Sequence, residues 1–179
     1  YVDLYQIHWP DSTTPIQESM EAVEKLIDDG KVRYAGVCNY NAVQLEEATK
    51  FTDVISDQVP YSMVKRDIEK ELVPYTIETN HGILAYSPLE RGLLTGKMKP
   101  GYKFSDGDHR AGLPYFTDEN IEQTNEFLEK IKVIANDKNA TLAQLVIRWT
   151  VEQPGITIAW SEPGILNRPY KMPVQWKSI

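Results

Sequence analysis

Short apolar runs alternate along residues 2–160 with longer segments whose apolar positions recur every three or four residues. The short runs have the length of strands, and the longer segments have the period of amphipathic helices. Five strands are predicted, at residues 2–8, 32–38, 54–59, 82–87 and 156–160. Because strands that alternate with helices are typical of βα units, the pattern predicts an α/β domain with a parallel sheet.

The first helix has clear start and stop signals. Thr14 is the predicted N-cap, Pro15 the first helical residue, Gln17 the capping-box partner and Gly30 the C-terminal stop. One apolar stripe follows this helix: Ile16, Met20, Val23, Leu26 and Ile27. The stripe indicates a helix that packs on the sheet.

Two further helices are predicted before the fourth strand. The helix near residues 41–51 has two candidate N-caps before it, Asn39 and Asn41. The helical pattern at 69–80 contains Pro74, which predicts either a kink or a later start near Leu72.

Residues 90–117 are rich in glycine and charge and show no periodicity. A segment this long is a candidate binding loop or lid. Two helices are predicted after it, at 119–138 and at 141–153, the second capped by Thr141.

Five parallel strands fit either an open doubly wound sheet or part of a closed (β/α)8 barrel. No GxGxxG pattern follows any strand, which disfavours the dinucleotide-binding open sheet. In a barrel, residues at the carboxyl ends of the strands carry the chemistry. Those ends hold His8, Trp9, Cys38, Asn39, Gln58, Tyr86 and Ser87.

These strand ends fit a planar heterocycle that carries a carboxamide. Asn39 and Gln58 supply amide donors and acceptors, Tyr86 supplies a flat ring, and Ser87 supplies a hydroxyl. A lone histidine such as His8 is more often a structural strand end, but these neighbours favour a ligand site.

Two other features allow two readings each. Cys38 precedes a helix, as some nucleophilic cysteines do, but no histidine is near it in sequence, so a packing role is favoured. The stretch SPLERGLLTGK is either a simple turn or a loop whose backbone and Arg91 bind a pyrophosphate.

Composition excludes several classes of partner. The 179 residues carry a net charge of −7 without a Lys/Arg cluster, which argues against nucleic-acid and membrane binding. One cysteine and no leader-like segment predict a reducing, cytoplasmic setting. No His/Cys/Asp spacing is typical of a metal site.

Five ordered motifs resemble one family. DLYQIHWPD, GKVRYAGVCNY, DQVPYSMVKRDIE, LAYSPLERGLLTGK and LAQLVIRWTVEQPG are similar to motifs of the aldo-keto reductases, particularly the general-stress and potassium-channel-β-like branches. The resemblance covers residues 1–160 and implies an NADP(H)-linked reductase of aldehydes and ketones on a (β/α)8 TIM barrel.

The resemblance also implies roles for the strand-end residues. His8 matches the histidine that orients the substrate carbonyl, and Trp9 matches an aromatic residue of the substrate pocket. Cys38 stands where the family has a serine beside the asparagine that holds the nicotinamide carboxamide. The remaining cofactor positions match Asn39, Gln58, Tyr86, Ser87, Leu89 and Arg91.

The chain departs from the family pattern in two places. Its first strand matches the family's fourth, so residues 1–160 are expected to be a truncated reductase domain without the family's tyrosine acid, lysine and aspartate, inactive alone. Residues 161–179 read as an irregular tail, the possible product of a frameshift, where the family has its 2′-phosphate loop; NAD(H) is therefore not excluded.

Alternatives to a reductase fragment stay open. A non-catalytic nucleotide-binding or regulatory module is the second reading. A TIM-barrel hydrolase ranks lower, because Asp11 and Asp57 offer no convergent pair of carboxylates. Exposed edges of a partial barrel also predict self-association.

Overall fold

The computed structural model describes residues 1–160, which form two compact units. The first unit contains Tyr1–Pro88 and Trp149–Trp160, and the second contains Leu89–Arg148. The predicted irregular tail and frameshift at 161–179 lie outside the described residues.

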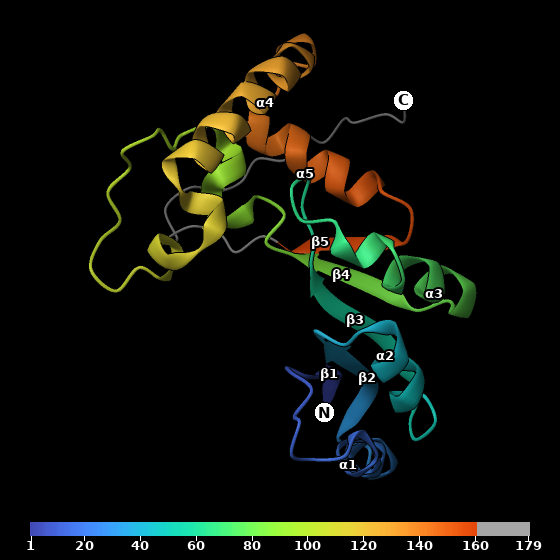
Figure 1. The fold of residues 1–179 in the computed structure, drawn as a ribbon. Coiled ribbons are helices and arrows are strands. Elements are labelled where there is room, and N and C mark those ends of the chain that lie inside the picture. Colours follow the sequence, from blue (N-terminus) through green and yellow to red (C-terminus); the bar gives the residue numbers. More distant parts are fainter. Residues whose placement is uncertain (161–179) are drawn as a thin grey trace. The chain divides into compact units, whose positions relative to one another are not determined.

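The first unit is built on one five-stranded parallel sheet in the order β1-β2-β3-β4-β5 (Figure 1). The strands are β1 (Val2–Ile7), β2 (Val32–Cys38), β3 (Val54–Pro60), β4 (Gly82–Tyr86) and β5 (Ile156–Trp160). Each boundary falls within one residue of its predicted place. The parallel α/β fold predicted from the alternating pattern is therefore confirmed.

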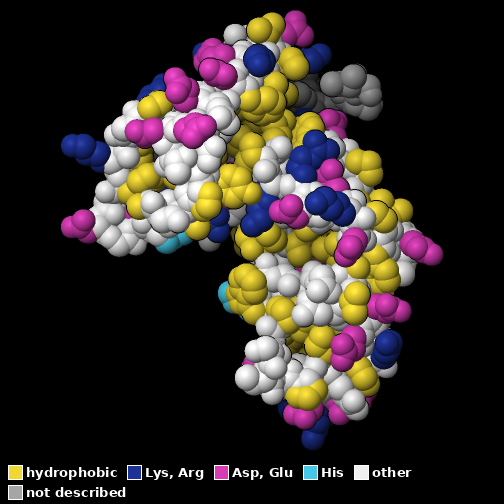
Figure 2. Space-filling view, viewed as in Figure 1, with side chains coloured by type: hydrophobic (Ala, Val, Ile, Leu, Met, Phe, Trp, Pro, Cys, Tyr) yellow, Lys and Arg dark blue, Asp and Glu magenta, His cyan; other side chains and the backbone are white. Residues whose placement is uncertain are grey.

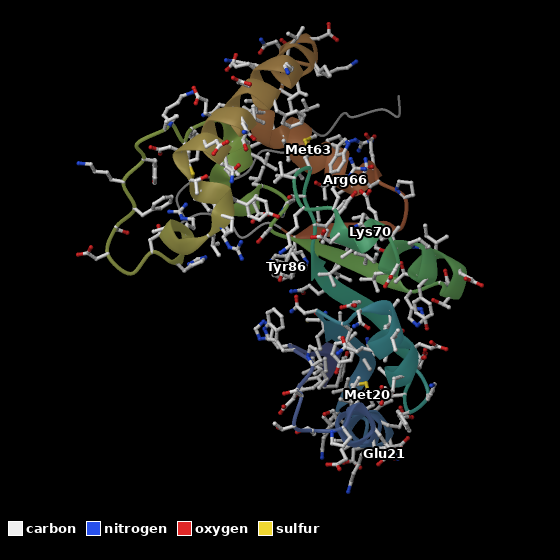
Figure 3. The ribbon with its side chains drawn as sticks, in the orientation of Figure 1. Met20, Glu21, Met63, Arg66, Lys70 and Tyr86 are labelled. Carbon is white, nitrogen blue, oxygen red and sulfur yellow. The ribbon has the colours of Figure 1, made fainter. Side chains whose placement is uncertain are left out.

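Three helices cover one face of this sheet: α1 (Ile16–Asp28), α2 (Ala42–Ala48) and α3 (Leu72–Thr79). Met20 of α1 points toward the strands, whereas its neighbour Glu21 points away (Figure 3). The core between helices and strands includes Met20, Val23, Ala35, Val37, Leu45, Ala48, Val59, Leu72, Val73, Ile83 and Ala85.

One helix cap is confirmed and another prediction is wrong. Asn41 caps α2, because its side chain accepts a hydrogen bond from the Gln44 backbone in a complete capping box. Thr14 does not cap α1, which begins at Ile16 after Pro15 and has no side-chain cap. The Thr14 hydroxyl instead donates to Asp11 at 3.2 Å.

The expected partner of Thr14 is also engaged elsewhere, since the Gln17 amide donates to Glu21 at 2.7 Å. At Pro74, the later helix start is the correct alternative. A short 3-10 turn, η1 (Asp67–Glu69), precedes α3, and Pro74 lies in the first turn, where backbone N–H groups have no partner within the helix.

The second unit contains the segment 90–117 and a long helix. The segment has no long element but forms three 3-10 turns: η2 (Glu90–Thr95), η3 (His109–Gly112) and η4 (Pro114–Phe116). Leu93, Met98 and Phe116 pack with Ile121 of α4 (Asp118–Asp137) in a small core. The segment 90–117, predicted as a binding loop or lid, is thus anchored by apolar contacts.

The last helix, α5 (Leu142–Glu152), begins as predicted. The Thr141 hydroxyl accepts a hydrogen bond from the Gln144 backbone at 3.2 Å, and the Gln144 side chain accepts from the Thr141 backbone at 2.8 Å. This reciprocal pair is a capping box.

Candidate functional site

The candidate site of the first unit lies where the parallel strands end. His8 follows β1, Asn39 follows β2, Gln58 lies near the end of β3, and Tyr86 ends β4. Because carboxyl ends of parallel strands meet at one edge of the sheet, these side chains share that edge. The structure confirms this shared placement, which the strand pattern had predicted.

Asn39 connects three of these strand ends. Its Nδ2 donates to the His8 carbonyl at 3.1 Å, and its Oδ1 accepts from the Tyr86 hydroxyl at 2.9 Å. Its backbone N–H donates to the Gln58 carbonyl at 3.0 Å. The residue has a φ of 62°, in the left-handed region that asparagine tolerates better than most residues.

The Asn39 carboxamide still has capacity for a ligand. A primary amide has two N–H donors and two acceptor lone pairs. His8 and Tyr86 use one donor and one acceptor position, so one of each has no partner among residues 1–160. A second carboxamide, such as that of nicotinamide, can use both at once.

Tyr86 is held at both ends. Its hydroxyl donates to Asn39, and its backbone carbonyl accepts from the Tyr61 N–H at 3.1 Å. The side chain, labelled in Figure 3, is half-buried, which leaves part of the ring accessible. A fixed and partly exposed ring is suited to stacking against a flat ligand.

Gln58 and Cys38 are paired in the register of β2 and β3. Cys38 is 3 % exposed, and Gln6 donates to its Sγ at 3.6 Å. Burial, with a further contribution from the negative charge of Asp57, raises the pKa of Cys38 to about 11. The thiol is therefore protonated at neutral pH, which supports a packing role over a nucleophilic one.

His8 and Trp9 extend beyond the end of β1. Their ring centroids are 6.0 Å apart with a tilt of 57°, and Trp9 is 58 % exposed. The His8 side chain is exposed as well, while its carbonyl is fixed by Asn39. Both rings are accessible, as substrate-contacting groups must be.

The remaining predicted residues follow β4 along the chain. Ser87 has a φ of 55°, and Glu90, Arg91 and Gly92 have φ values of 43°, 50° and 94°. Arg91 pairs with the buried carboxylate of Glu90 at 2.9 Å, and its carbonyl accepts from Arg110 at 3.1 Å. Leu89 is half-buried at the start of the second unit. Positive φ values in a turn can present backbone N–H groups to an anion, although the Gly92 N–H here donates to the Leu89 carbonyl at 3.1 Å.

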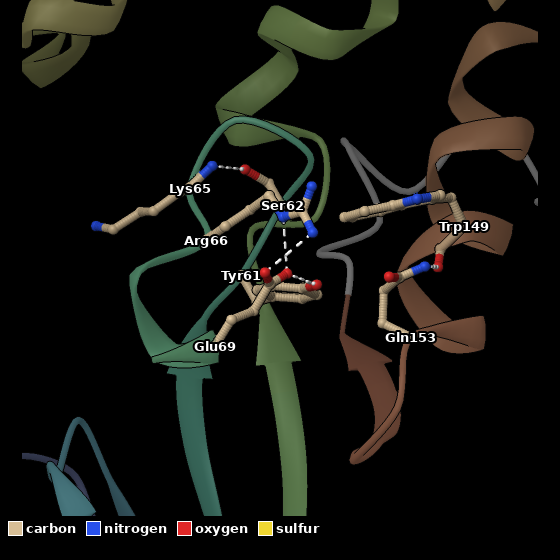
Figure 4. A network of polar contacts seen from close by, with 7 residues as sticks. All are labelled: Tyr61, Ser62, Lys65, Arg66, Glu69, Trp149 and Gln153. Atoms are coloured by element: carbon tan, nitrogen blue, oxygen red, sulfur yellow. Dashed lines mark hydrogen bonds and ion pairs between the residues drawn. The ribbon is translucent and has the colours of Figure 1, made fainter. Parts of the chain in front are cut away.

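A polar network after β3 was not predicted from the sequence (Figure 4). The Tyr61 hydroxyl donates to Glu69 at 2.5 Å, and the guanidinium of Arg66 donates to both Glu69 oxygens at 2.7 and 2.9 Å. Arg66 also lies 5.4 Å over the ring of Trp149, which stacks on Tyr61 with centroids 5.7 Å apart. These contacts fix the segment between β3 and α3.

Tyr61, Arg66 and Glu69 shift one another's pKa values. The hydrogen bonds from Arg66 lower the pKa of Glu69, whereas burial and Glu69 raise the pKa of Tyr61. The Arg66-to-Glu69 spacing in the motif DQVPYSMVKRDIE was a signal for this ion pair. The participation of Trp149 had no local signal, because that residue lies far along the chain.

The sequence predicts no role for Asp57 beyond excluding it, with Asp11, as a catalytic pair of carboxylates. The structure places Asp11 on the surface, where it accepts from Thr13 and Thr14, and places Asp57 in the core with no exposed area. Burial raises the pKa of Asp57 to about 8. A carboxylate inside the apolar run VISDQV was the available signal.

Over residues 1–160, no three His, Cys, Asp or Glu side chains gather as metal ligands do. In the same range, no helix is long and apolar enough to cross a bilayer. On the face drawn in Figure 2, lysine and arginine side chains are dispersed among acidic ones.

A parallel α/β sheet with polar strand ends occurs in open doubly wound sheets and in (β/α)8 barrels. Comparison with known proteins identifies the family. Residues 1–162 match the model of the aldo/keto reductase family. The chain belongs to this family.

Individual relatives agree. The chain is 35 % identical over 171 residues to aldo-keto reductase YhdN of Bacillus subtilis (strain 168), a match that covers 93 % of this chain and 52 % of YhdN. Among solved structures, the glycerol dehydrogenase AKR11B4 of Gluconobacter oxydans matches with a TM-score of 0.83 and 36 % identity, over 88 % of this chain and 48 % of that one.

A thermostable aldo-keto reductase, Tm1743, solved with the inhibitor epalrestat, matches with a TM-score of 0.67 and 27 % identity, over 92 % of this chain and 51 % of its own. The chain therefore spans about half the length of the relatives it matches. Its five-stranded parallel sheet corresponds to part of their barrel fold.

Proposed function

We propose that this chain is the cofactor-binding part of an NADP(H)-dependent aldo-keto reductase that reduces aldehydes and ketones to alcohols. The observation that carries the proposal is the hydrogen-bonded set of His8, Asn39 and Tyr86 at the strand ends. Within the described residues, the Asn39 carboxamide of this set keeps one unused donor and one unused acceptor beside a fixed aromatic ring, which suits a nicotinamide carboxamide and its ring.

Each residue has a proposed role. Asn39 and Gln58 hold the carboxamide, Cys38 packs beside them, and the nicotinamide stacks on Tyr86. His8 orients the substrate carbonyl, and Trp9 contacts the substrate. Bound reduced nicotinamide supplies the hydride.

The pyrophosphate is proposed to bind along the chain segment that follows β4. Its members are Ser87, Leu89 and Arg91. The left-handed φ values at Ser87 and Arg91 support this, because such backbone turns N–H groups toward an anion. Arg91 keeps further N–H donors besides the one it gives to Glu90.

Some finer assignments belong to the proposal as well. We place the chain in the general-stress or potassium-channel-β-like branch, as a C-terminal part with residues 1–160 as its reductase domain, and in the cytoplasm. NADP(H) is the proposed cofactor, with NAD(H) as the alternative to be measured. We further propose self-association through the outer strands β1 and β5, where Val2, Tyr5 and Ile158 are 50 %, 42 % and 49 % exposed.

The second candidate is a non-catalytic nucleotide-binding module. It is favoured by the presence of cofactor-site residues on a chain whose motifs match the family only from its fourth strand onward. The family's tyrosine acid contributes strongly to rate, since general acid–base groups contribute about 10²- to 10⁴-fold. We therefore expect cofactor binding without turnover from this chain alone.

The two candidates are separated in one experiment. NADPH and, in parallel, NADH are titrated with the purified chain while nicotinamide fluorescence is followed, and 4-nitrobenzaldehyde is then added. Saturable binding without oxidation supports the proposed inactive reductase part. Steady oxidation of NADPH contradicts the expected inactivity, and the absence of binding to either nucleotide contradicts the proposed function.

A further inference from the structure

Asp57 places a carboxyl group inside the core of the first unit. It lies in β3, in register with Val37 of β2 and Ile83 of β4, and it has no exposed area. Among residues 1–160, no donor has the distance and angle of a hydrogen bond to either of its side-chain oxygens. A buried polar group without such partners destabilises the folded state, so the groups around Asp57 decide which charge state it adopts.

The groups that face Asp57 come from the turn between β2 and α2. The backbone N–H groups of Asn39 and Tyr40 lie close enough to lower the pKa of Asp57, but burial raises that pKa more strongly, to about 8. The titratable side chains beside it are Cys38 and Tyr40. Burial raises the pKa of both, and the negative charge of Asp57 raises them further.

The two carboxylates that shift pKa values at this turn are Asp57 and Glu47. Glu47 of α2 also raises the pKa of Tyr40, and no cation contributes to the shift of Asp57 within the described part of the chain. An ionised Asp57 would therefore be a buried charge without an opposite charge beside it, which is strongly unfavourable.

The turn above Asp57 carries the central residue of the candidate site. Asn39 holds its left-handed backbone there and contacts His8, Gln58 and Tyr86. Tyr40, the next residue, is 3 % exposed. Movement of this turn must therefore disturb the hydrogen bonds of Asn39.

We propose that Asp57 is a positioning residue: its neutral carboxyl packs beneath the Asn39–Tyr40 turn and holds Asn39 in its binding geometry, and its ionisation favours an opened turn with lower cofactor affinity. The cofactor part of this inference rests on the proposed function. The action of Asp57 on the turn does not.

The direction of the pH effect follows from the two states of the carboxyl group. In an opened, hydrated turn the group has its ordinary pKa of 3.8, whereas in the closed turn the pKa is about 8. The closed turn is therefore fully favoured below the lower value and loses stability as pH rises toward the upper one, by up to about tenfold in the opening equilibrium per pH unit. Above the upper value the effect levels off.

Amide hydrogen exchange measures this opening directly. The exchange of the Asn39 and Tyr40 amides is followed by NMR between roughly pH 5 and pH 8 and is corrected for the intrinsic base-catalysed rate. We expect protection at both amides to fall with pH more steeply than protection at Ile83 and Ala85 in β4, which reports global unfolding. In Asp57→Asn, which is neutral at every pH, the additional slope disappears.

A matched control and a second measurement complete the test. Asp53→Asn removes an exposed carboxylate from the residue before β3 and is expected to keep the wild-type slope. In the wild type, the Cγ chemical shift of Asp57 gives its own titration without any variant. A midpoint near 8 supports the inference, and a midpoint near 4 overturns it.

The remaining outcomes are also decisive. The inference is overturned if Asn39 and Tyr40 follow the same slope as β4, or if Asp57→Asn keeps the additional slope. NADPH affinity is expected to fall between pH 6 and pH 8 in the wild type but not in Asp57→Asn. If neither protein binds NADPH while the turn still titrates, the action of Asp57 on the turn is supported and the proposed function fails.

Discussion

At the scale of single residues, the site depends on how Asn39 and Tyr86 fix each other. Their hydrogen bond at 2.9 Å spans β2 and β4 across the intervening strand β3. It orients a carboxamide and an aromatic ring through contacts within the chain. Such preorganisation reduces the entropy lost on binding.

Two substitutions at Tyr86 separate the hydroxyl from the ring. Tyr86→Phe removes the hydrogen bond to Asn39, so we expect NADPH affinity to fall about fivefold, corresponding to about 1 kcal/mol. Tyr86→Ala also removes the stacking surface, and we expect a loss of roughly 100-fold. Fluorescence titration gives both dissociation constants, and equal losses in the two variants would show that the ring contributes nothing.

The reactivity of the Cys38 thiol reports on the electrostatics at the same edge of the sheet. It is the only cysteine of the chain, and its pKa is raised to about 11 by burial and by Asp57. We expect iodoacetamide at pH 8 to label it about 100-fold more slowly in the native protein than in concentrated urea, because the thiolate is the nucleophile. Mass spectrometry measures the rate, and fast native labelling would contradict the buried, neutral thiol.

The sequence predicted which residues lie together at the site where those residues stand at the ends of strands. The alignment of His8, Asn39 and Tyr86 followed from the parallel strands alone. The environment of Asp57 could not be predicted in this way, because burial and missing partners depend on which helix covers β3. The stacking of Trp149 on Tyr61 likewise depends on tertiary packing between distant segments.

At the scale of elements, caps show why local signals succeed or fail. Asn41 and Gln44 satisfy each other in α2, as their spacing predicts. Thr14 and Gln17 have the same spacing at the start of α1, but Asp11 and Glu21 engage them instead. A nearby competing acceptor therefore decides between two equally good local patterns.

The two predicted caps make a matched pair of variants. Asn41→Ala removes a real capping box and is expected to lower the free energy of unfolding by about 1 kcal/mol. Thr14→Ala removes a hydroxyl that does not cap, so we expect a loss below about 0.5 kcal/mol. Urea unfolding followed by circular dichroism gives both values, and a larger loss at Thr14 would reverse this assignment.

The network after β3 supports a second prediction at this scale. Tyr61 is 1 % exposed, so its end of the hydrogen bond to the half-buried Glu69 carboxylate is shielded from water. In a double-mutant cycle of Tyr61→Phe and Glu69→Gln, we expect a coupling of about 1–2 kcal/mol in unfolding. The exposed pair Lys31 and Asp29, substituted by alanine, is the control and is expected to couple by less than about 0.5 kcal/mol. Equal coupling in both cycles would argue against a specific role for burial.

At the scale of the whole molecule, the regular βα pattern made the fold predictable. Apolar-rich segments of strand length alternate along the first unit with helices whose apolar residues recur at helical spacing, which is typical of βα units around a parallel sheet. The segment 90–117 lacks such periodicity. Its 3-10 turns are held by the contacts of Leu93, Met98 and Phe116, which no local pattern specifies.

We propose that the strand-end residues of this chain form a nicotinamide site. NADPH titration calorimetry on the wild type, Asn39→Ala and Asn80→Ala measures whether they do. Asn80 is a strain-matched control, because its φ of 59° is close to the 62° of Asn39, but it precedes β4 and therefore lies at the opposite edge of the sheet. We predict that Asn39→Ala weakens NADPH binding at least about tenfold while Asn80→Ala binds as the wild type does. Equal affinities in all three proteins, or no binding by the wild type, would contradict the claim.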